Sequence, residues 1–320
     1  MKNLNKKKMN IVLKTGFYAF LIFIIFFRNI NESHFFLSLF FLFFLFFSVV
    51  EHSKSIKESF YKLKDKRMLI PFFSDIVFLF FYGLIVLPLL DRVVDYVMAI
   101  GYHMSKSSGE ITRQYIATES ILNALLSNPD ILSYFKKIVV LFFIIVIAVY
   151  VVYCLFQGIS WKICYGKTKY NYIKQFFLIN IFWVLIFVVQ QLVSLFFDLR
   201  MAVIKSINPS VVAKTNPVPT IILVVIVYFA LVSYALVGKL KVREALKKCF
   251  VTGIKKFKDI GLMYVFVVAM FFVLNRVLFA VGRINNILMI VLGVLLVIPA
   301  FSFTRLFIID VVGNILKNKK

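Results

Sequence analysis

The sequence predicts an all-α protein, a polytopic transmembrane helical bundle of about eight spans with amphipathic interfacial helices. Of the 320 residues, 62% are hydrophobic and 16% are charged, and the mean hydropathy is +0.94. A soluble domain is about 45–50% apolar and about 25% charged. So few charges could not cover so much apolar surface, so a soluble enzyme, a disordered chain, a collagen-like chain and a coiled coil are excluded.

Apolar runs mark the individual spans, because a membrane helix needs about 20 mostly apolar residues. The runs cover residues 11–27, 35–50, 72–90, 138–157, 176–197, 219–238, 260–281 and 286–309, in one integral membrane domain over 1–320. The first two are short, and a re-entrant hairpin is the alternative to two crossings. No small-residue cleavage site follows Phe27, which favours an uncleaved anchor over a signal peptide.

The distribution of the 38 lysines and arginines predicts the orientation. Twenty-five lie on one side of the predicted threading, ten lie on the other side and three lie within spans. The richer side comprises residues 1–10, 51–71, 158–175, 239–259 and the tail after 309. The positive-inside rule therefore places both termini in the cytoplasm, with the protein in the cell membrane.

Two of these basic loops have an apolar stripe at helical spacing. In 239–259 the stripe is Val242, Leu246, Phe250, Ile254 and Phe257. Its cations include Lys241, Arg243, Lys247, Lys248, Lys255, Lys256 and Lys258. In 54–67 the stripe is Ile56, Phe60 and Leu63. The pattern predicts interfacial helices on anionic inner-leaflet lipid, with an acidic protein as a possible partner. The alternative is that these cations only set the topology.

The segment 91–137 is the only sizeable loop on the less basic side. We expect one or two surface helices in it, with a start near Ser108 and Gly109 and an end at Asn128 and Pro129. A loop of this length is longer than a connection needs. It would serve either as a lid or partner surface, or as packing over the outer ends of the spans.

Polar residues within spans are candidates for function, because burying them in lipid is costly. Toward the outer side they are Gln190, Gln191, Asn275 and Arg276, and toward the inner side Asp75, Asn180 and Arg305. Glutamine and asparagine can either line a transport path or join helices by hydrogen bonds. Asp75 and Arg305 lie at matching depth, so they either pair with one another or reach the inner surface separately.

Three stretches resemble a known group of membrane proteins. They are 55–71, an amphipathic helix with a lysine-rich end and a proline that opens the span, together with 243–250 and 292–300. They are similar to uncharacterised prokaryotic, especially archaeal, multi-pass membrane proteins. That group includes the membrane domains attached to glycerophosphodiester phosphodiesterases. The resemblance covers about half of the chain, implies a helical membrane bundle and carries over no catalytic residue.

Signatures of catalysis are missing from the sequence. It has no GxxxxGK[ST], GxGxxG, HExxH or GxSxG, and its three cysteines lack metal-ligand spacing. We expect no enzyme activity and no cofactor, and His34, His52 and His103 to be surface residues. The net charge of +24 is interpreted as a sign of membrane topology rather than of nucleic-acid binding.

A non-enzymatic scaffold, assembly factor or partner-binding module is the first hypothesis for the function. The alternative is a transporter or permease of small or lipid-like cargo.

Overall fold

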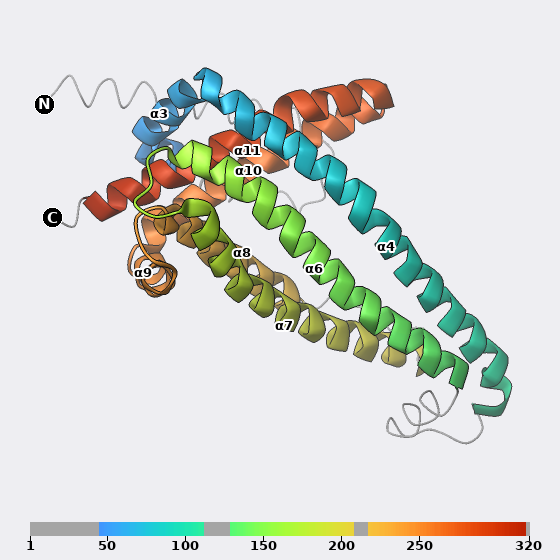
Figure 1. The fold of residues 1–320 in the computed structure, drawn as a ribbon. Coiled ribbons are helices and arrows are strands. Elements are labelled where there is room, and N and C mark those ends of the chain that lie inside the picture. Colours follow the sequence, from blue (N-terminus) through green and yellow to red (C-terminus); the bar gives the residue numbers. More distant parts are fainter. Residues whose placement is uncertain (1–44, 112–128, 208–216, 318–320) are drawn as a thin grey trace, which may run out of the picture. The chain divides into compact units, whose positions relative to one another are not determined.

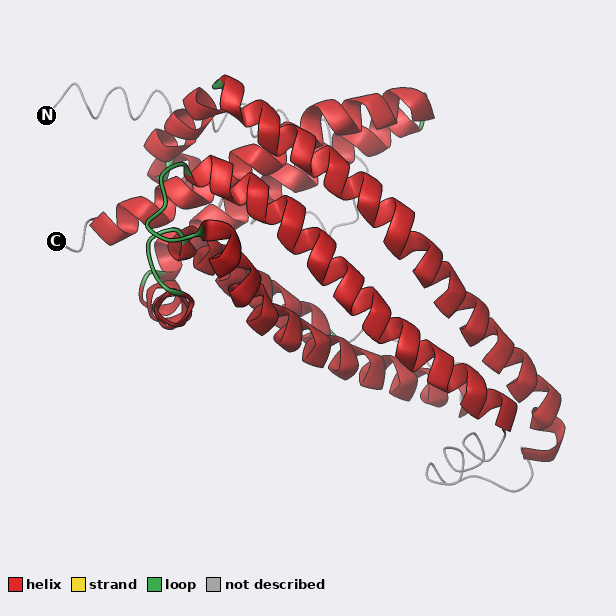
Figure 2. Ribbon diagram, viewed as in Figure 1, coloured by secondary structure: helices red, strands yellow, loops and turns green. Residues whose placement is uncertain are grey.

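The computed structural model describes residues 45–111, 129–207 and 217–317, and within them all regular structure is helical (Figure 2). The helices are α3 (Ser53–Leu63), the 3₁₀ helix η1 (Lys66–Met68), α4 (Leu69–Ile111), α6 (Pro129–Tyr165), α7 (Tyr172–Ile207), α8 (Val218–Val237), α9 (Val242–Lys255), α10 (Phe257–Gly282) and α11 (Asn286–Lys317) (Figure 1). A helical stretch over 45–51 precedes α3. The predicted all-α class is confirmed.

Six helices among the described residues are long and apolar enough to cross a membrane: α4, α6, α7, α8, α10 and α11. Each overlaps one of the six spans predicted from residue 72 onward. The predicted span 11–27 and most of 35–50 lie outside the described residues, as does the choice between two crossings and a hairpin. The six helices support a membrane protein by their length and composition.

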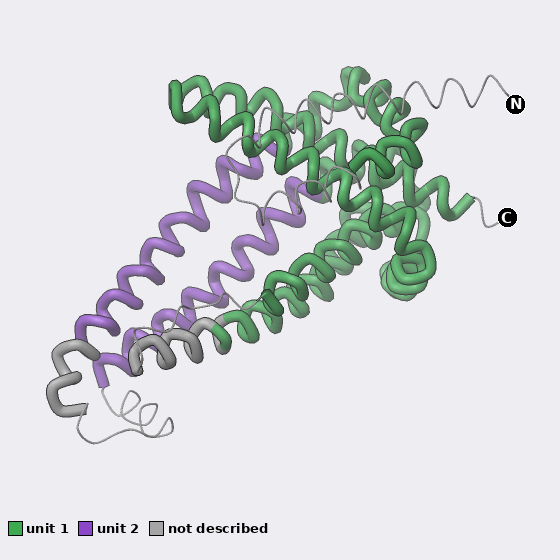
Figure 3. The backbone as a smooth tube through the Cα atoms, turned by 180° about the vertical axis from the view of Figure 1, so that it is seen from behind, with its two compact units in different colours: residues 1–74, 158–320 green, residues 75–157 purple. Residues whose placement is uncertain are grey.

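The structure divides into two compact units, coloured separately in Figure 3. Unit 1 comprises residues 1–74 and 158–320. Within it α7 packs on α8, α8 on α9 and α11, and α11 on both α10 and α3. Its core is rich in aromatic side chains, and the fully buried ones include Tyr172, Phe176 and Phe307. Large flat rings fill the space between these helices, as expected where each contributes a large buried area.

Unit 2 comprises residues 75–157, most of α4 with the larger part of α6. Aromatic pairs join the two helices along their length. Phe81 stacks on Phe156 with ring centroids 5.5 Å apart, and Tyr96 lies 5.8 Å from Tyr134. At one end Gln157 Nε2 donates a 3.1 Å hydrogen bond to Asp75 Oδ1. Unit 2 is thus a long helical hairpin held by aromatic contacts.

The expectation of separate surface helices in 91–137 is wrong for the described part of that segment. Residues 91–111 continue α4 without a break, and 129–137 begin α6. Nothing in 91–111 stops a helix, so Ser108 and Gly109 lie inside α4 rather than at a start. Pro129 opens a helix instead of ending one, because the first turn does not need the N–H that proline lacks. Residues 112–128 lie outside the described residues.

Candidate functional site

Helix α9 is attached to the bundle through small side chains. Its buried residues are Ala245, Cys249, Thr252 and Gly253. A Cβ at Gly253 would lie only 2.7 Å from a ring carbon of Phe229 on α8, so the glycine allows α9 to approach α8 closely. The Tyr228 hydroxyl, also on α8, donates a 2.8 Å hydrogen bond to the Gly253 carbonyl. These contacts fix which face of α9 points away from the protein.

The outward face of α9 and its connection to α10 are both apolar and basic. Ile254 is 68% exposed and Phe257 is 67% exposed. The seven predicted cations are also exposed, and none is in an ion pair within the described part of the chain: Lys241, Arg243, Lys247, Lys248, Lys255, Lys256 and Lys258. Large apolar side chains beside unpaired lysines are typical of a helix that lies in a membrane interface.

Helix α3 repeats this arrangement. Its buried residues are Ser55 and Ser59, whereas Phe60 is 55% exposed and Tyr61 is 76% exposed. Lysines lie on the same exposed surface, including Lys57. In a soluble helix the large apolar side chains would be the buried ones. Here both rings are more than half-exposed, as they would be beside lipid, and the Phe60 ring also lies 4.7 Å from that of Phe303 on α11.

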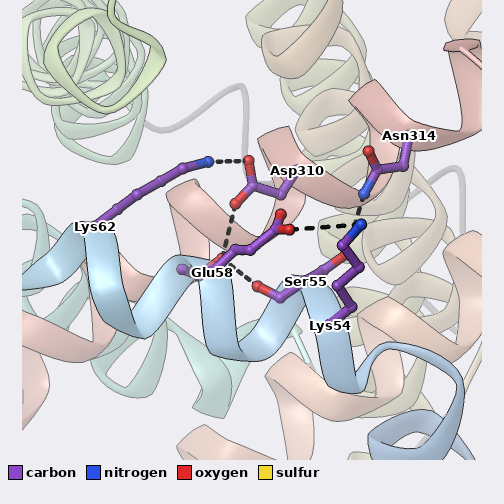
Figure 4. A network of polar contacts seen from close by, with 7 residues as sticks. Lys54, Ser55, Glu58, Lys62, Asp310 and Asn314 are labelled. Carbon is purple, nitrogen blue, oxygen red and sulfur yellow. Dashed lines mark hydrogen bonds and ion pairs between the residues drawn. The ribbon is translucent and has the colours of Figure 1, made fainter.

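A polar network holds α3 on α11 (Figure 4). The Lys62 ammonium pairs with the carboxylate of Asp310, whose side chain is only 11% exposed. The Ser59 hydroxyl donates to Asp310 Oδ2 at 3.1 Å, and Asn314 Nδ2 donates to the Ser55 hydroxyl at 3.4 Å. The network fixes the rotation of α3 about its axis, with Phe60 half-exposed beside Phe303 of α11.

The expectation that His52 is a surface histidine is wrong. It is buried, its Nε2–H donates a 2.9 Å hydrogen bond to the Asp259 carbonyl, and its ring meets Phe307 edge-on at 5.8 Å. Burial lowers the pKa of His52 below the ordinary 6.5, so the neutral ring is favoured. His52 thereby joins the start of α3 to the start of α10.

A periodic signal in the sequence could have located this contact. Ser48, His52, Ser55 and Ser59 follow one another at intervals of four, three and four residues, and all four are buried. The Ser48 hydroxyl donates to the Leu262 carbonyl at 2.6 Å. A stripe of small polar residues at helical spacing therefore marks the face that packs on protein.

Asn180 and Gln190 on α7 are both buried and bind α8. The Tyr234 hydroxyl donates to Asn180 Oδ1 at 2.6 Å, and Gln190 Nε2 donates to the Pro219 carbonyl at 3.1 Å. Gln191 donates to Gln190 Oε1 at 2.7 Å. Asn180 and Gln190 thus join two helices by hydrogen bonds. This is one of the two roles predicted for them, the other being to line a transport path.

Asn275 and Arg276 are exposed on α10, where the Arg276 guanidinium lies 5.1 Å from the ring centre of Phe272. No hydrogen bond seen among the described residues links this pair to Gln190 and Gln191. Among the described residues, hydrogen bonds therefore do not connect the two outer polar pairs.

Asp75 and Arg305 are both buried within protein, at 2% and 4% exposure. The alternative prediction, that each side chain reaches the inner surface separately, is therefore wrong. Asp75 accepts the hydrogen bond from Gln157 in unit 2, and Arg305 Nη1 lies 3.5 Å from the Ser302 hydroxyl in unit 1. Because they belong to different units, their mutual pairing stays a prediction.

A cavity of about 900 Å³ lies between α8, α9, α10 and the stretch 45–51. Its walls are almost wholly apolar, with Val225 and Phe229 from α8 and Gly261 and Val265 from α10. Lys258 contributes the one charged side chain among the described lining residues.

The three cysteines are buried and free of disulfides. Burial raises the pKa of the Cys249 thiol on α9 to about 12, so it stays protonated at neutral pH. No group of three or more His, Cys, Asp or Glu side chains within the described ranges could hold a metal ion.

No family model, curated protein or solved structure matches the chain. The resemblance to prokaryotic membrane proteins over 55–71, 243–250 and 292–300 therefore stays untested, and function is argued from the geometry.

Proposed function

We propose that the protein is a non-enzymatic membrane scaffold. Its helical bundle holds α3 and α9 on the inner leaflet, where their cations bind anionic lipid and can receive an acidic protein partner. The observation that carries the proposal is the shared mode of attachment. Small side chains face the bundle, while Phe60, Tyr61, Ile254 and Phe257 are more than half-exposed beside lysines.

Physical chemistry supports this placement of the two helices. Exposed aromatic and aliphatic side chains gain free energy by entering the leaflet, at about 25 cal/mol per Å² of apolar surface. Each lysine or arginine near an anionic surface adds about 1 kcal/mol. The two contributions act together only if apolar and basic groups share the outward side, as they do on α9.

The use of buried polar groups favours a scaffold over a coupled transporter. Asn180 and Gln190 bind α8, and Asp75 accepts a hydrogen bond from Gln157. Coupled transporters place such groups at broken helices around a central site. Here the bonds hold continuous helices together.

A carrier of lipid-like cargo is the second candidate, and the apolar cavity beside α9 favours it. Such a carrier would move lipid between leaflets, whereas a scaffold would only bind it. The two candidates therefore differ in a measurable flux.

The test uses the full chain with the substitution Ile254→Cys, labelled with an environment-sensitive fluorophore. The native thiols are buried, so the introduced one reacts selectively. In vesicles we expect a blue-shifted emission that brominated phosphatidylglycerol quenches more strongly than brominated phosphatidylcholine. A label at Ile290→Cys, on an exposed apolar position of α11, serves as the control and should show equal quenching by both lipids.

Equal quenching at residue 254 by both lipids would contradict anionic-lipid binding by α9. Transbilayer movement of a fluorescent lipid is measured in the same vesicles. A flux that depends on the protein would replace the scaffold with the carrier.

A further inference from the structure

We infer that the cavity between α8, α9 and α10 binds one acyl chain of an anionic phospholipid, with the phosphate held at Lys258. The inference rests on the proposed function in one respect, the placement of α9 in the leaflet. It adds a discrete site to what would otherwise be a diffuse basic surface.

The volume and the lining of the cavity suit a hydrocarbon chain. Its volume of about 900 Å³ lies within the range of about 300–1,000 Å³ common for small-molecule sites. Val225, Phe229, Leu262 and Val265 supply apolar walls. The Tyr228 hydroxyl, which also borders it, is already engaged by the Gly253 carbonyl. Apolar walls do not hold water well, so a lipid chain is the favoured occupant in a bilayer.

The charge at the cavity identifies the headgroup. Lys258 lines the cavity and is exposed, and Lys255 and Lys256 precede it closely and are exposed too. An ammonium group binds phosphate as a compact point charge. A single phospholipid has both parts, a phosphate for Lys258 and a chain for the apolar walls. An anionic headgroup is preferred because Lys258 has no acidic partner among the described ion pairs, and Lys255 and Lys256 close by in the chain add to the positive charge.

Gly261 offers a way to close the cavity without disturbing the fold. It borders the cavity on α10, and a Cβ there would meet only ring atoms of Phe257 at 3.8–4.0 Å, which is ordinary contact. The substitution Gly261→Leu therefore adds a side chain on the cavity wall with no clash at its Cβ, and it raises helix propensity. Gly253 is unsuitable, because a Cβ there would collide with Phe229.

The experiment uses the full chain in lipid nanodiscs that contain phosphatidylglycerol or phosphatidylcholine, each with a photoreactive diazirine in one acyl chain. We expect cross-links to gather on cavity residues such as Val225 and Val265. Phosphatidylglycerol should exceed phosphatidylcholine by about fivefold, the factor expected for one surface lysine. Gly261→Leu should lower the yield by about tenfold or more, and Lys258→Gln should equalise the two lipids.

Matched controls separate the site from general effects. Gly293→Leu on α11 introduces the same side chain where the nearest atom to the Cβ is 4.0 Å away, outside the cavity. Lys247→Gln removes an exposed charge of α9 that does not line the cavity. Both variants should retain the wild-type cross-linking pattern.

Unchanged cross-linking in Gly261→Leu would overturn the inference. So would a photoreactive residue at position 225 that couples to another segment of the chain instead of lipid. Residue 254 lines the cavity, so a label at Val251→Cys, an exposed position of α9 outside the lining, separates the two proposals. If the site fails while quenching at residue 251 keeps a preference for anionic lipid, the scaffold proposal stands. If both fail, both are wrong.

Discussion

The hydroxyl of Tyr234 on α8 donates a 2.6 Å hydrogen bond to Oδ1 of Asn180 on α7, and both side chains are buried. Asn180 in turn donates from Nδ2 to the Phe176 carbonyl at 2.7 Å. The asparagine is therefore satisfied on both sides of its amide. A buried amide of this kind lowers the stability of the fold only when one of its hydrogen-bond partners is removed.

Tyr234→Phe should destabilise the bundle by about 1 kcal/mol, within the range up to about 1.7 kcal/mol known for hydrogen bonds between membrane helices. The ring and its contacts with Trp161 and Phe176 remain, so the loss reports the hydroxyl. Denaturant unfolding in mixed micelles, followed by circular dichroism, measures it. Tyr61→Phe, at an exposed ring, is the control, and an equal loss there would contradict the assignment.

His52 should make stability depend on pH. Its pKa is lowered by burial in the folded state, so the unfolded chain binds more protons below about 6.5. Stability is therefore full above that pH and declines as the pH falls toward the lowered pKa. The midpoint of thermal unfolding should fall from pH 7 to about pH 5, and His52→Gln should flatten this decline. His103→Gln should retain it; a decline that survives His52→Gln has another origin.

The Lys62–Asp310 pair should anchor α3. Asp310→Asn removes the charge that Lys62 and Ser59 both contact. We expect a loss of about 1 kcal/mol, because Lys62 is half-exposed and solvent screens the pair. Limited proteolysis within α3 should accelerate as well. Lys57→Gln, an exposed lysine of the same helix, should change neither property, and similar effects of both variants would show that only net charge matters.

Asp75 and Arg305 remain a predicted pair. A double-mutant cycle with Asp75→Asn and Arg305→Gln on thermal stability would measure their coupling. Pairing predicts a coupling of at least about 0.5 kcal/mol, whereas strictly additive losses would show that each is stabilised by its own neighbours. Gln157→Leu, which removes the described partner of Asp75, provides the scale for comparison.

The orientation of the chain can be measured with a thiol reagent that does not cross membranes. Ile284→Cys lies in the turn between α10 and α11, where Ile284 is 85% exposed, and Lys255→Cys lies on α9. The 25-to-10 charge split predicts labelling at 284 in intact cells and labelling at 255 only after lysis. The opposite pattern would invert the threading.

The helical membrane class and the positions of the spans were predictable from the sequence because both depend on long apolar runs. The six spans from residue 72 onward fall on long helices, since no local feature competes with about 20 apolar residues in succession. The exposure of all seven cations on and beside α9 also followed from the helical period. Such properties depend on the local sequence and not on contacts between distant segments.

The faces of α3 and α9 that pack on protein were harder to predict. In a membrane protein the largest apolar residues need not face the core, because lipid accepts them equally well. Contact is decided by what fits, and here serine, alanine, cysteine and glycine fit. The burial of His52 and the apolar cavity beside Gly261 both arise from this packing between distant segments.

Helix α4 has 43 residues, about 65 Å at 1.5 Å per residue, whereas the hydrocarbon core is about 30 Å thick. Its charged half begins at Asp91 and runs to Ile111, about 30 Å farther along the axis. Even at a tilt of about 40° this half would rise about 23 Å above the lipid core. With Asp91 at the edge of the lipid core, we therefore expect the end of α4 to stand beyond the headgroups, within reach of soluble proteins and polymers that never touch the bilayer.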